Sequence, residues 1–224
     1  MNSPIDIVIF DCDGVLVESE WLAARIQAEL GTEMGWPLSP AEAAARFLGL
    51  SAESIRTQIA AHLGADAAHT WWERFMERYR RGVDAGLAPP VDGLTEVLDD
   101  LTVPFCVASS GSHEKIAYSL HRAGLYDRFA GRLYSATDVA RGKPAPDLFL
   151  YAAEAMGADP AACAVVEDSP AGVAAARAAG MRVFARTSGL CPPSRLSGAR
   201  TILFGDMRDL PGLFGRGPRH GAEE

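Results

Sequence analysis

One stretch near the start of the chain decides the fold: Ile5-Asp6-Ile7-Val8-Ile9-Phe10, followed directly by Asp11-Cys12-Asp13-Gly14. A short run of β-branched and aromatic residues favours a buried strand. The acids and the glycine after it indicate that the strand ends in a polar loop. In a parallel sheet, such a loop lies at the carboxyl end of a strand, which is where ligands bind.

The segment that follows, residues 19 to 81, has helical spacing. Its apolar residues recur three and four positions apart, with breaks at Gly35-Trp36-Pro37, Gly49 and Gly64. This pattern predicts four helices with no strand between them. Residues 17–87 would therefore form a helical insert, hinged at the acidic loop 13–18 and at Ala88-Pro89-Pro90.

Beyond Gly93, apolar runs alternate with helical spacing. Strands are predicted at residues 105–108, 133–136, 162–166, 182–185 and 201–204, and helices at 113–123, 146–156 and 171–179. This alternation is typical of a doubly wound parallel sheet. We therefore expect an α/β core made of residues 1–16 and 88–215, interrupted by the insert, and a flexible polar tail at 216–224.

Composition excludes several classes of protein. The 224 residues are 48% hydrophobic and 22% charged, as in globular domains, and their net charge of -8 argues against a nucleic-acid partner. No signal peptide is evident, and no apolar run approaches the roughly 20 residues of a membrane helix. The four cysteines form no CxxC pair, which fits a reducing compartment. We expect a cytoplasmic protein without a membrane partner.

Polar residues gather on one predicted rim of the sheet. Asp11 and Asp13 follow the first strand, Ser109 the second and Glu167-Asp168 a later one, while Lys143 precedes a helix. Taken singly, each has an ordinary explanation as a turn, a helix cap or a solvated charge. Their convergence on one rim favours a site for a phosphorylated ligand.

The acidic residues of this rim predict a metal ion. Carboxylates gathered so closely repel one another, and a hard divalent cation such as Mg²⁺ relieves that repulsion. We expect Asp11 and Asp168 to bind Mg²⁺ directly and Asp13 to bind it through its backbone carbonyl. Glu167 belongs to the same metal-binding set.

The same rim can carry out phosphoryl transfer. Lys143 would balance the charge of Asp11 and keep it ionised as a nucleophile. Ser109, with the N–H groups that begin its helix, would hold phosphate oxygens. Asp13 would protonate the leaving alcohol and later take a proton from water.

Four segments together resemble the motifs of the haloacid dehalogenase superfamily. They are FDCDGVLVESE (10–20), VASS (107–110), GKPAPD (142–147) and VEDSPAG (166–172), in order along nearly the whole chain. The resemblance implies a Rossmann-like core, Mg²⁺, a nucleophilic Asp11, an acid/base Asp13 and a cap that closes over the substrate. It also gives roles to Ser109, Lys143 and the Glu167-Asp168 pair. The insert is similar to the cap of the subgroup containing β-phosphoglucomutase and phosphoglycolate phosphatase, and residues 13–19 most resemble 6-phosphogluconate phosphatase-like members.

Three positions separate this chain from the mutases of that subgroup. The mutases carry a histidine, a lysine and an arginine in the cap, where Ala23, Leu48 and Ala52 stand here. We therefore expect a phosphatase of sugar or sugar-acid phosphates that works through an aspartyl-phosphate. A phosphosugar mutase and a non-catalytic phospho-ligand-binding protein are the alternatives. Asp13 and Asp168 argue against a metal-free dehalogenase.

Substrate contacts are expected from the rim and from the cap. The candidates are Gly14, Arg46, Gly49, Ser110, Gly111 and His113. Arg46 has a second interpretation as a solvated residue, and Lys115 is expected to be a helix cap or solvated. The aromatic residues between 71 and 79 have the spacing of a cap core. A small-molecule partner and a monomer are expected, with a dimer left open.

Overall fold

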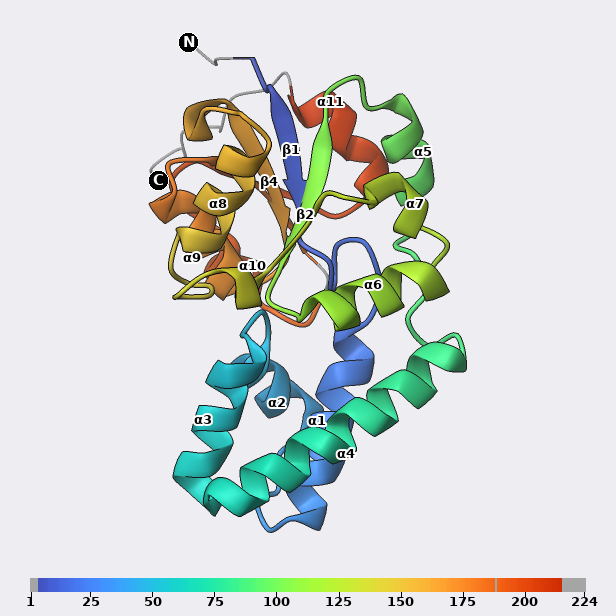
Figure 1. The fold of residues 1–224 in the computed structure, drawn as a ribbon, viewed down its shortest axis with the longest axis vertical. Coiled ribbons are helices and arrows are strands. Elements are labelled where there is room, and N and C mark those ends of the chain that lie inside the picture. Colours follow the sequence, from blue (N-terminus) through green and yellow to red (C-terminus); the bar gives the residue numbers. More distant parts are fainter. Residues whose placement is uncertain (1–3, 188, 215–224) are drawn as a thin grey trace.

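The computed structural model describes residues 4–187 and 189–214, and its centre is one parallel sheet of six strands (Figure 1). The strands are β1 (Ile7–Phe10), β2 (Phe105–Ser109), β3 (Leu133–Ser135), β4 (Cys163–Glu167), β5 (Arg182–Arg186) and β6 (Thr201–Phe204). Their order is β3-β2-β1-β4-β5-β6, so β1 is central. All six carboxyl ends therefore meet at one rim. The tail predicted at 216–224 lies outside the described residues.

Helices cover both faces of the sheet. Val8 and Phe10 of β1 belong to the apolar core on one face, while Ile7 and Ile9 belong to the core on the other. This two-sided burial explains the unbroken apolar run of the strand. The first face is covered by α5 (Leu94–Asp100), α6 (His113–Arg122), α7 (Tyr126–Phe129) and α11 (Leu210–Phe214); the second by α8 (Asp147–Ala155), α9 (Pro170–Ala178) and α10 (Pro193–Leu196). Short 3-10 turns lie at Ala136–Asp138, Pro160–Ala162 and Met207–Asp209.

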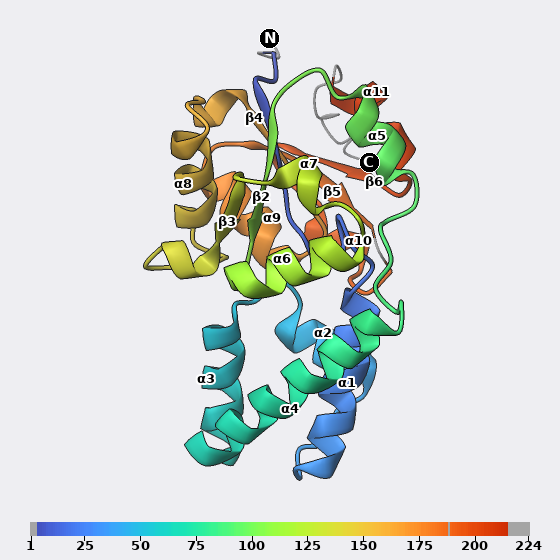
Figure 2. The ribbon, with the colours of Figure 1, turned by 45° about the vertical axis from the view of Figure 1, so that its right-hand side comes forward.

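The helical insert lies below the rim of the sheet in Figures 1 and 2. It consists of α1 (Glu20–Glu33), α2 (Pro40–Phe47), α3 (Ala52–Leu63) and α4 (Ala65–Asp84), the four helices that the spacing predicted. Trp71, Phe75 and Tyr79 are buried in an apolar core of its own, as expected of residues at helical spacing. Trp72, expected in the same core, is only partly buried and packs against it. The bounds 17–87 stay a prediction.

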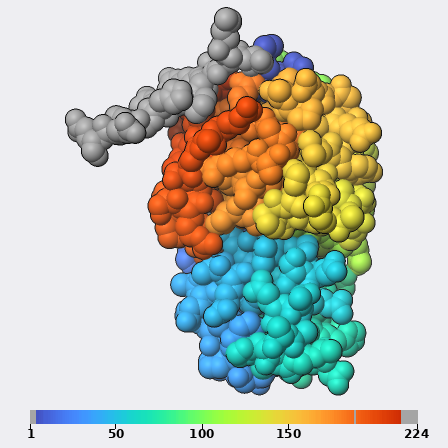
Figure 3. All heavy atoms as spheres, turned by 90° about the vertical axis from the view of Figure 1, so that its left-hand side faces the viewer, coloured from blue at the N-terminus to red at the C-terminus, as the bar shows by residue number. Residues whose placement is uncertain are grey.

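Two chain segments join the insert to the sheet, and they lie side by side. Glu18 donates its backbone N–H to Pro89 at 2.8 Å, and Val91 donates to Leu16 at 3.0 Å. The two halves also meet directly on the face shown in Figure 3. The insert is therefore held over the carboxyl ends of the strands.

The sequence pattern located all six strands to within two residues but missed the shortest helices. α5, α7, α10 and α11 were not predicted; they have seven, four, four and five residues, and one or two turns of helix are too short to display a periodicity. All four cysteines are buried and free, as core residues should be. None of the helices in the described part of the chain has the length and hydrophobicity of a membrane span.

Candidate active site

Asp11 lies at the end of the central strand and is bonded to a buried lysine. Lys143 Nζ is 2.7 Å from Asp11 Oδ1 and 2.8 Å from Glu167 Oε1. All three side chains are nearly inaccessible to solvent, with exposed fractions of 6%, 1% and 0% for Asp11, Lys143 and Glu167. Residues 132 positions apart thus form the ion pair that sequence analysis predicted between Asp11 and Lys143.

Glu167 organises the loop between β4 and α9. Its Oε2 accepts hydrogen bonds from the backbone N–H groups of Asp168 at 2.8 Å and Ser169 at 2.7 Å, and from the Ser169 hydroxyl at 2.9 Å. Ser169 in turn caps α9 through the N–H of Gly172. A Cβ at Gly172 would overlap the Glu167 carboxylate, so only glycine fits there. Glu167 therefore fixes both Lys143 and the position of Asp168.

The acidic residues at the rim suit a hard divalent cation. Asp11, Glu167 and Asp168 are all buried, and each offers a carboxylate oxygen within 4.8 Å of the others. Lys143 supplies a single positive charge to this group. Buried carboxylate oxygens are the ligands that Mg²⁺ prefers, so the donor set fits the predicted ion.

Burial and neighbouring charge control the ionisation of this cluster. Burial raises the pKa of Asp11 to about 7, a shift that Lys143 opposes and Glu167 reinforces. Burial favours the neutral amine of Lys143, but Asp11 and Glu167 raise its pKa above the ordinary value. Added positive charge from a cation would favour ionised Asp11.

Asp13, the expected acid/base, is held by donors from three directions. Lys115 Nζ lies 2.6 and 2.7 Å from its two carboxylate oxygens, Ser19 Oγ donates at 2.6 Å and the Tyr79 hydroxyl at 3.1 Å. Burial alone would raise the pKa of Asp13, but Lys115 and these hydrogen bonds lower it. Tyr79 belongs to the insert and Lys115 to α6, so Asp13 joins the two halves of the molecule.

The expectation that Lys115 is a helix cap or solvated was wrong. Ser112 caps α6, whereas the Lys115 side chain runs into the site, is 14% exposed and lies over the Tyr79 ring at 4.5 Å. Lys115 lies six residues after Ser109, in the first turn of α6. That spacing is a weak signal, because only the pairing with Asp13 shows which way the side chain turns.

The serine loop after β2 begins α6 at the same rim. Ser109 is buried and its Oγ accepts a hydrogen bond from the N–H of Gly111 at 3.2 Å. Ser110 Oγ donates to the backbone oxygen of Gly49 at 2.9 Å, which ties the loop after α2 to the core. The three predicted positions Ser109, Ser110 and Gly111 therefore lie together with Gly49.

A cavity of about 290 Å³ separates the rim from the insert, a size at the small end of small-molecule sites. Of the predicted site residues, Asp11, Asp13, Gly49, Ser109, Ser110 and Gly111 line it. Lys143, Glu167 and Asp168 lie behind that surface, fully buried. Gly14 adopts a φ of +75°, and a Cβ there would overlap Asp168, so its part is to let the loop approach the acidic cluster.

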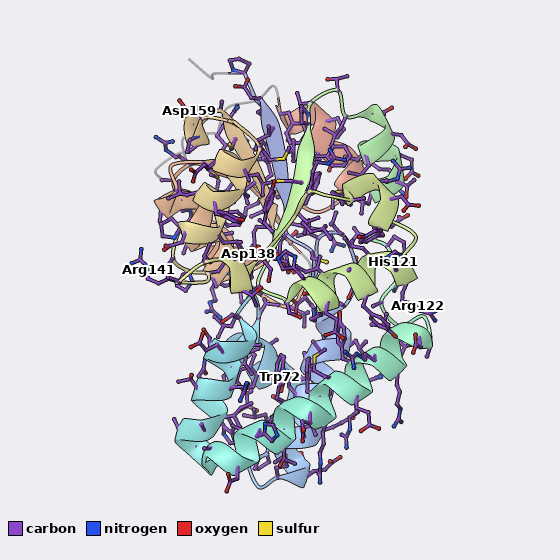
Figure 4. The ribbon with its side chains drawn as sticks, viewed as in Figure 1. Trp72, His121, Arg122, Asp138, Arg141 and Asp159 are labelled. Carbon is purple, nitrogen blue, oxygen red and sulfur yellow. The ribbon has the colours of Figure 1, made fainter. Side chains whose placement is uncertain are left out.

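Two predicted substrate residues lie away from this cavity. Arg46 is exposed, stacks over Trp36 at 5.3 Å and lines a different hollow near Pro192. The His113 ring lies 2.8 Å from Asp138, and its side chain is half exposed. Figure 4 labels Asp138 beside the start of α6, outside the insert. Neither side chain therefore lines the cavity.

Two residues that sequence analysis did not single out belong to the site. Glu20 opens α1 and lines the cavity, where burial, with Asp13 nearby, raises its pKa to about 8. Arg186, at the end of β5, donates to the backbone oxygen of Gly14 at 2.7 Å and pairs with Glu18. Arg186 thereby fixes the loop that carries Asp13.

The metal-free protein is expected to become less stable as pH rises from about 5 to about 8. Because the pKa values of Asp11 and Glu20 are raised to about 7 and about 8, the folded state keeps protons that the unfolded chain releases above about pH 4 to 5. The folded state binds more protons in this window, so the free energy of unfolding falls with pH. Asp13, whose pKa is lowered, titrates below the window.

Mg²⁺ should reverse this trend, because it binds ionised carboxylates. We expect its stabilising effect to be larger at pH 8 than at pH 5. Thermal melts at both pH values, in EDTA and in excess Mg²⁺, measure the difference. A melting temperature that Mg²⁺ raises most at pH 5 would contradict the assignment.

Comparisons with known proteins agree with this geometry. A model of the haloacid dehalogenase-like hydrolases matches residues 5–180. The chain is 34% identical to a 6-phosphogluconate phosphatase of Escherichia coli, over 81% of this chain and 82% of that protein. It is 30% identical to a β-phosphoglucomutase of Bacillus subtilis, over 78% and 80% of the two chains. A haloacid dehalogenase-like protein of unknown function from Agrobacterium tumefaciens superposes with a TM-score of 0.78 at 36% identity, covering 93% of this chain and 97% of its own. The chain belongs to the haloacid dehalogenase-like hydrolase family, as one of its phosphoric monoester hydrolases.

Proposed function

We propose that this protein is a Mg²⁺-dependent phosphatase of small sugar or sugar-acid phosphates that forms an aspartyl-phosphate on Asp11. The observation that carries the proposal is the buried Asp11–Lys143–Glu167 triad at the base of an enclosed cavity. It combines a carboxylate nucleophile, a fixed cation and a second buried carboxylate. Phosphoryl transfer depends on this kind of positioning and charge neutralisation.

In the first step, a carboxylate oxygen of Asp11 attacks phosphorus and the bond to the substrate's alcohol oxygen breaks. Asp13 gives its proton to that oxygen, so the alcohol leaves neutral. Lys143 stays bonded to Asp11 and stabilises the charge around it. Ser109 and the N–H groups that begin α6 are placed to bind phosphate oxygens.

In the second step, Asp13 takes a proton from water and the water oxygen attacks phosphorus. The bond between phosphorus and Asp11 breaks, which releases phosphate and restores the Asp11 carboxylate. The lowered pKa of Asp13 suits its role as a base. To act as the acid in the first step it must carry a proton, so its pairing with Lys115 has to loosen when substrate binds.

Mg²⁺ would be held by Asp11, Asp168 and the backbone carbonyl of Asp13. When bound, it neutralises charge on the phosphoryl oxygens and on the carboxylates. The four hydrogen bonds that Glu167 already accepts favour a positioning role for it, holding Asp168 and Lys143.

The insert acts, in this proposal, as a cap that excludes water from the reaction. Contacts that close it over the rim support this role. Arg80 pairs with Glu114, and the Tyr118 hydroxyl donates to Asp84 at 2.6 Å. Arg122, labelled in Figure 4 near the end of α4, also pairs with Asp84 at 3.0 Å. These contacts lie at the surface, where ion pairs are weak enough to break on opening.

Replacing Gly49 with alanine should hold the cap open. Gly49 has a φ of +73°, and a Cβ there would overlap Ser169 of the core. We expect Gly49→Ala to lower kcat/KM roughly 10- to 100-fold, since small displacements at a reacting site have effects of that size. Steady-state kinetics on one substrate measures this.

Gly64→Ala is the matched control. Gly64 also has a positive φ, +94°, but nothing lies within 4 Å of its missing Cβ. Both variants put a Cβ at a positive φ and should each lose about 1–3 kcal/mol of stability from backbone strain. Equal kcat/KM values for the two variants would show that the loop after α2 has no part in cap closure.

A panel of phosphorylated compounds tests the function itself. It contains sugar phosphates, sugar-acid phosphates, phosphoglycolate, nucleotides and p-nitrophenyl phosphate, each with Mg²⁺ and with EDTA. We expect phosphate release that requires Mg²⁺. Failure to release phosphate from any member with Mg²⁺ present would overturn the proposal.

The mutase alternative finds no support in the cavity. Ala23, Leu48 and Ala52 all line it, so the three positions that are polar in mutases offer nothing to a second phosphate. The two cations of the lining, Arg80 and Lys115, are already paired with carboxylates. A non-catalytic binding protein, in turn, would have no use for a buried nucleophile with a second, acid/base aspartate two residues along the chain.

A further inference from the structure

The cavity above Asp11 has two unlike sides. Its core side is formed by the polar rim of the sheet. Among the described residues, every apolar side chain of the lining comes from the insert, and the largest are Phe47, Leu48, Leu50, Ile55, Trp72, Phe75 and Met76. Trp72 lies on the α4 side of the insert in Figure 4. A leaving alcohol that points from Asp11 toward the insert would therefore meet mainly carbon, with Glu20, Gln27 and Arg80 as the polar groups on that side.

Several polar side chains of the lining already have a partner within the protein. Lys115 is bonded to Asp13, and Arg80 to Glu114. The Gln27 carboxamide oxygen accepts a hydrogen bond from Trp71, and Ser110 donates to Gly49. In the part of the chain that the structure describes, Glu20 is the one lining carboxylate to which no side chain or backbone group donates. A sugar with many hydroxyls would find few free partners.

We propose that the substrate is a phosphate monoester whose alcohol has a largely apolar carbon frame, such as a deoxy or carbocyclic counterpart of a sugar, and no second phosphate. The proposal rests on the Mg²⁺-dependent phosphatase chemistry proposed above, and it narrows the substrate from sugar and sugar-acid phosphates to their less hydroxylated counterparts. Hydroxyls pressed against Phe75 and Met76 would lose their water without gaining a hydrogen bond, which disfavours a polyol. Methylene groups in the same place gain from leaving water. A second phosphate would have to compete with Asp13 for Lys115 or with Glu114 for Arg80.

A matched pair of esters tests this. Cyclohexylmethyl phosphate and glucose 6-phosphate have six-membered rings of similar size and are both esters of primary alcohols, so they differ mainly in ring hydroxyls. With Mg²⁺, we expect kcat/KM to be at least about tenfold higher for cyclohexylmethyl phosphate. Equal values, or a preference for glucose 6-phosphate, would overturn the inference.

A pair of variants ties the preference to the insert. Met76→Gln keeps the length of a lining side chain but adds an amide, and should reduce the ratio of the two kcat/KM values at least about fivefold. Met34→Gln makes the same change at the end of α1, outside the cavity lining, and should leave the ratio unchanged. The ratio is independent of the folded fraction of a sample, so partial unfolding of Met76→Gln does not hide the effect. An unchanged ratio in Met76→Gln would count against the inference.

The controls separate this inference from the function beneath it. If p-nitrophenyl phosphate is hydrolysed with Mg²⁺ and neither ring ester is, the inference fails while the phosphatase function stands. If no ester is hydrolysed at all, the phosphatase function fails and the inference falls with it.

Discussion

Replacing Asp11 with asparagine should abolish turnover and leave the protein folded. An amide cannot attack phosphorus as a carboxylate does, and loss of a nucleophile lowers kcat by at least about 10³-fold. The fold should tolerate the change, because burial already raises the pKa of Asp11 and makes its charge unfavourable there. Phosphate release, with circular dichroism and a thermal melt, measures both effects.

Asp99→Asn is the matched control for this variant. Asp99 is 60% exposed and pairs with Arg128 on the surface, so the same chemical change there should leave kcat unaltered. The wild-type protein, quenched in acid during turnover, should also carry one added phosphoryl group by mass spectrometry, and Asp11→Asn should not. Near-normal turnover in Asp11→Asn would remove Asp11 as the nucleophile.

Replacing Lys143 with methionine should have the largest effect on stability. Methionine keeps the unbranched stem but removes the ammonium group that lies between Asp11 and Glu167. Leaving buried charges without a partner typically costs about 3–5 kcal/mol. For a chain of this size that corresponds to a fall in melting temperature of roughly 10 °C. Activity should be lost as well, because Asp11 would take up a proton.

The loss of stability in Lys143→Met should depend on pH. At pH 5 Asp11 can be neutral and the repulsion from Glu167 disappears, so the variant should lie closer to the wild type than at pH 8. Lys115→Met is the comparison: Asp13 would keep Ser19 and Tyr79 as donors, so a smaller loss is expected. A Lys143→Met protein as stable as the wild type at pH 8 would show that the buried ion pairs contribute little.

Local patterns in the sequence determined the fold and the catalytic rim. Runs such as Ile7–Phe10 are short, β-branched and buried on both faces, so each strand was recognisable without its neighbours. Once the strands were known to be parallel, their carboxyl ends had to share one edge. Asp11, Asp13, Ser109 and the Glu167-Asp168 pair follow strands directly, and their meeting follows from that topology.

The tertiary structure alone decided which way the helical side chains turn. Lys115 lies 102 residues from Asp13, and nothing local distinguishes it from a solvated lysine until α6 packs beside α4. Arginine and histidine are suited to phosphate binding, yet Arg46 packs on Trp36 and His113 pairs with Asp138, and neither lines the cavity. The side of a helix that faces a cavity depends on packing between the insert and the core.

The apolar lining of the cavity shows the same division. Helical spacing determined that Trp71, Phe75 and Tyr79 belong to the insert's interior. That Phe75 also lines the cavity above Asp11 depends on how α1 to α4 pack over the rim, which the spacing does not predict. A pattern of apolar residues predicts that a surface is shielded from water. Whether protein or substrate shields it depends on the distances between chain segments, and the sequence does not give those distances.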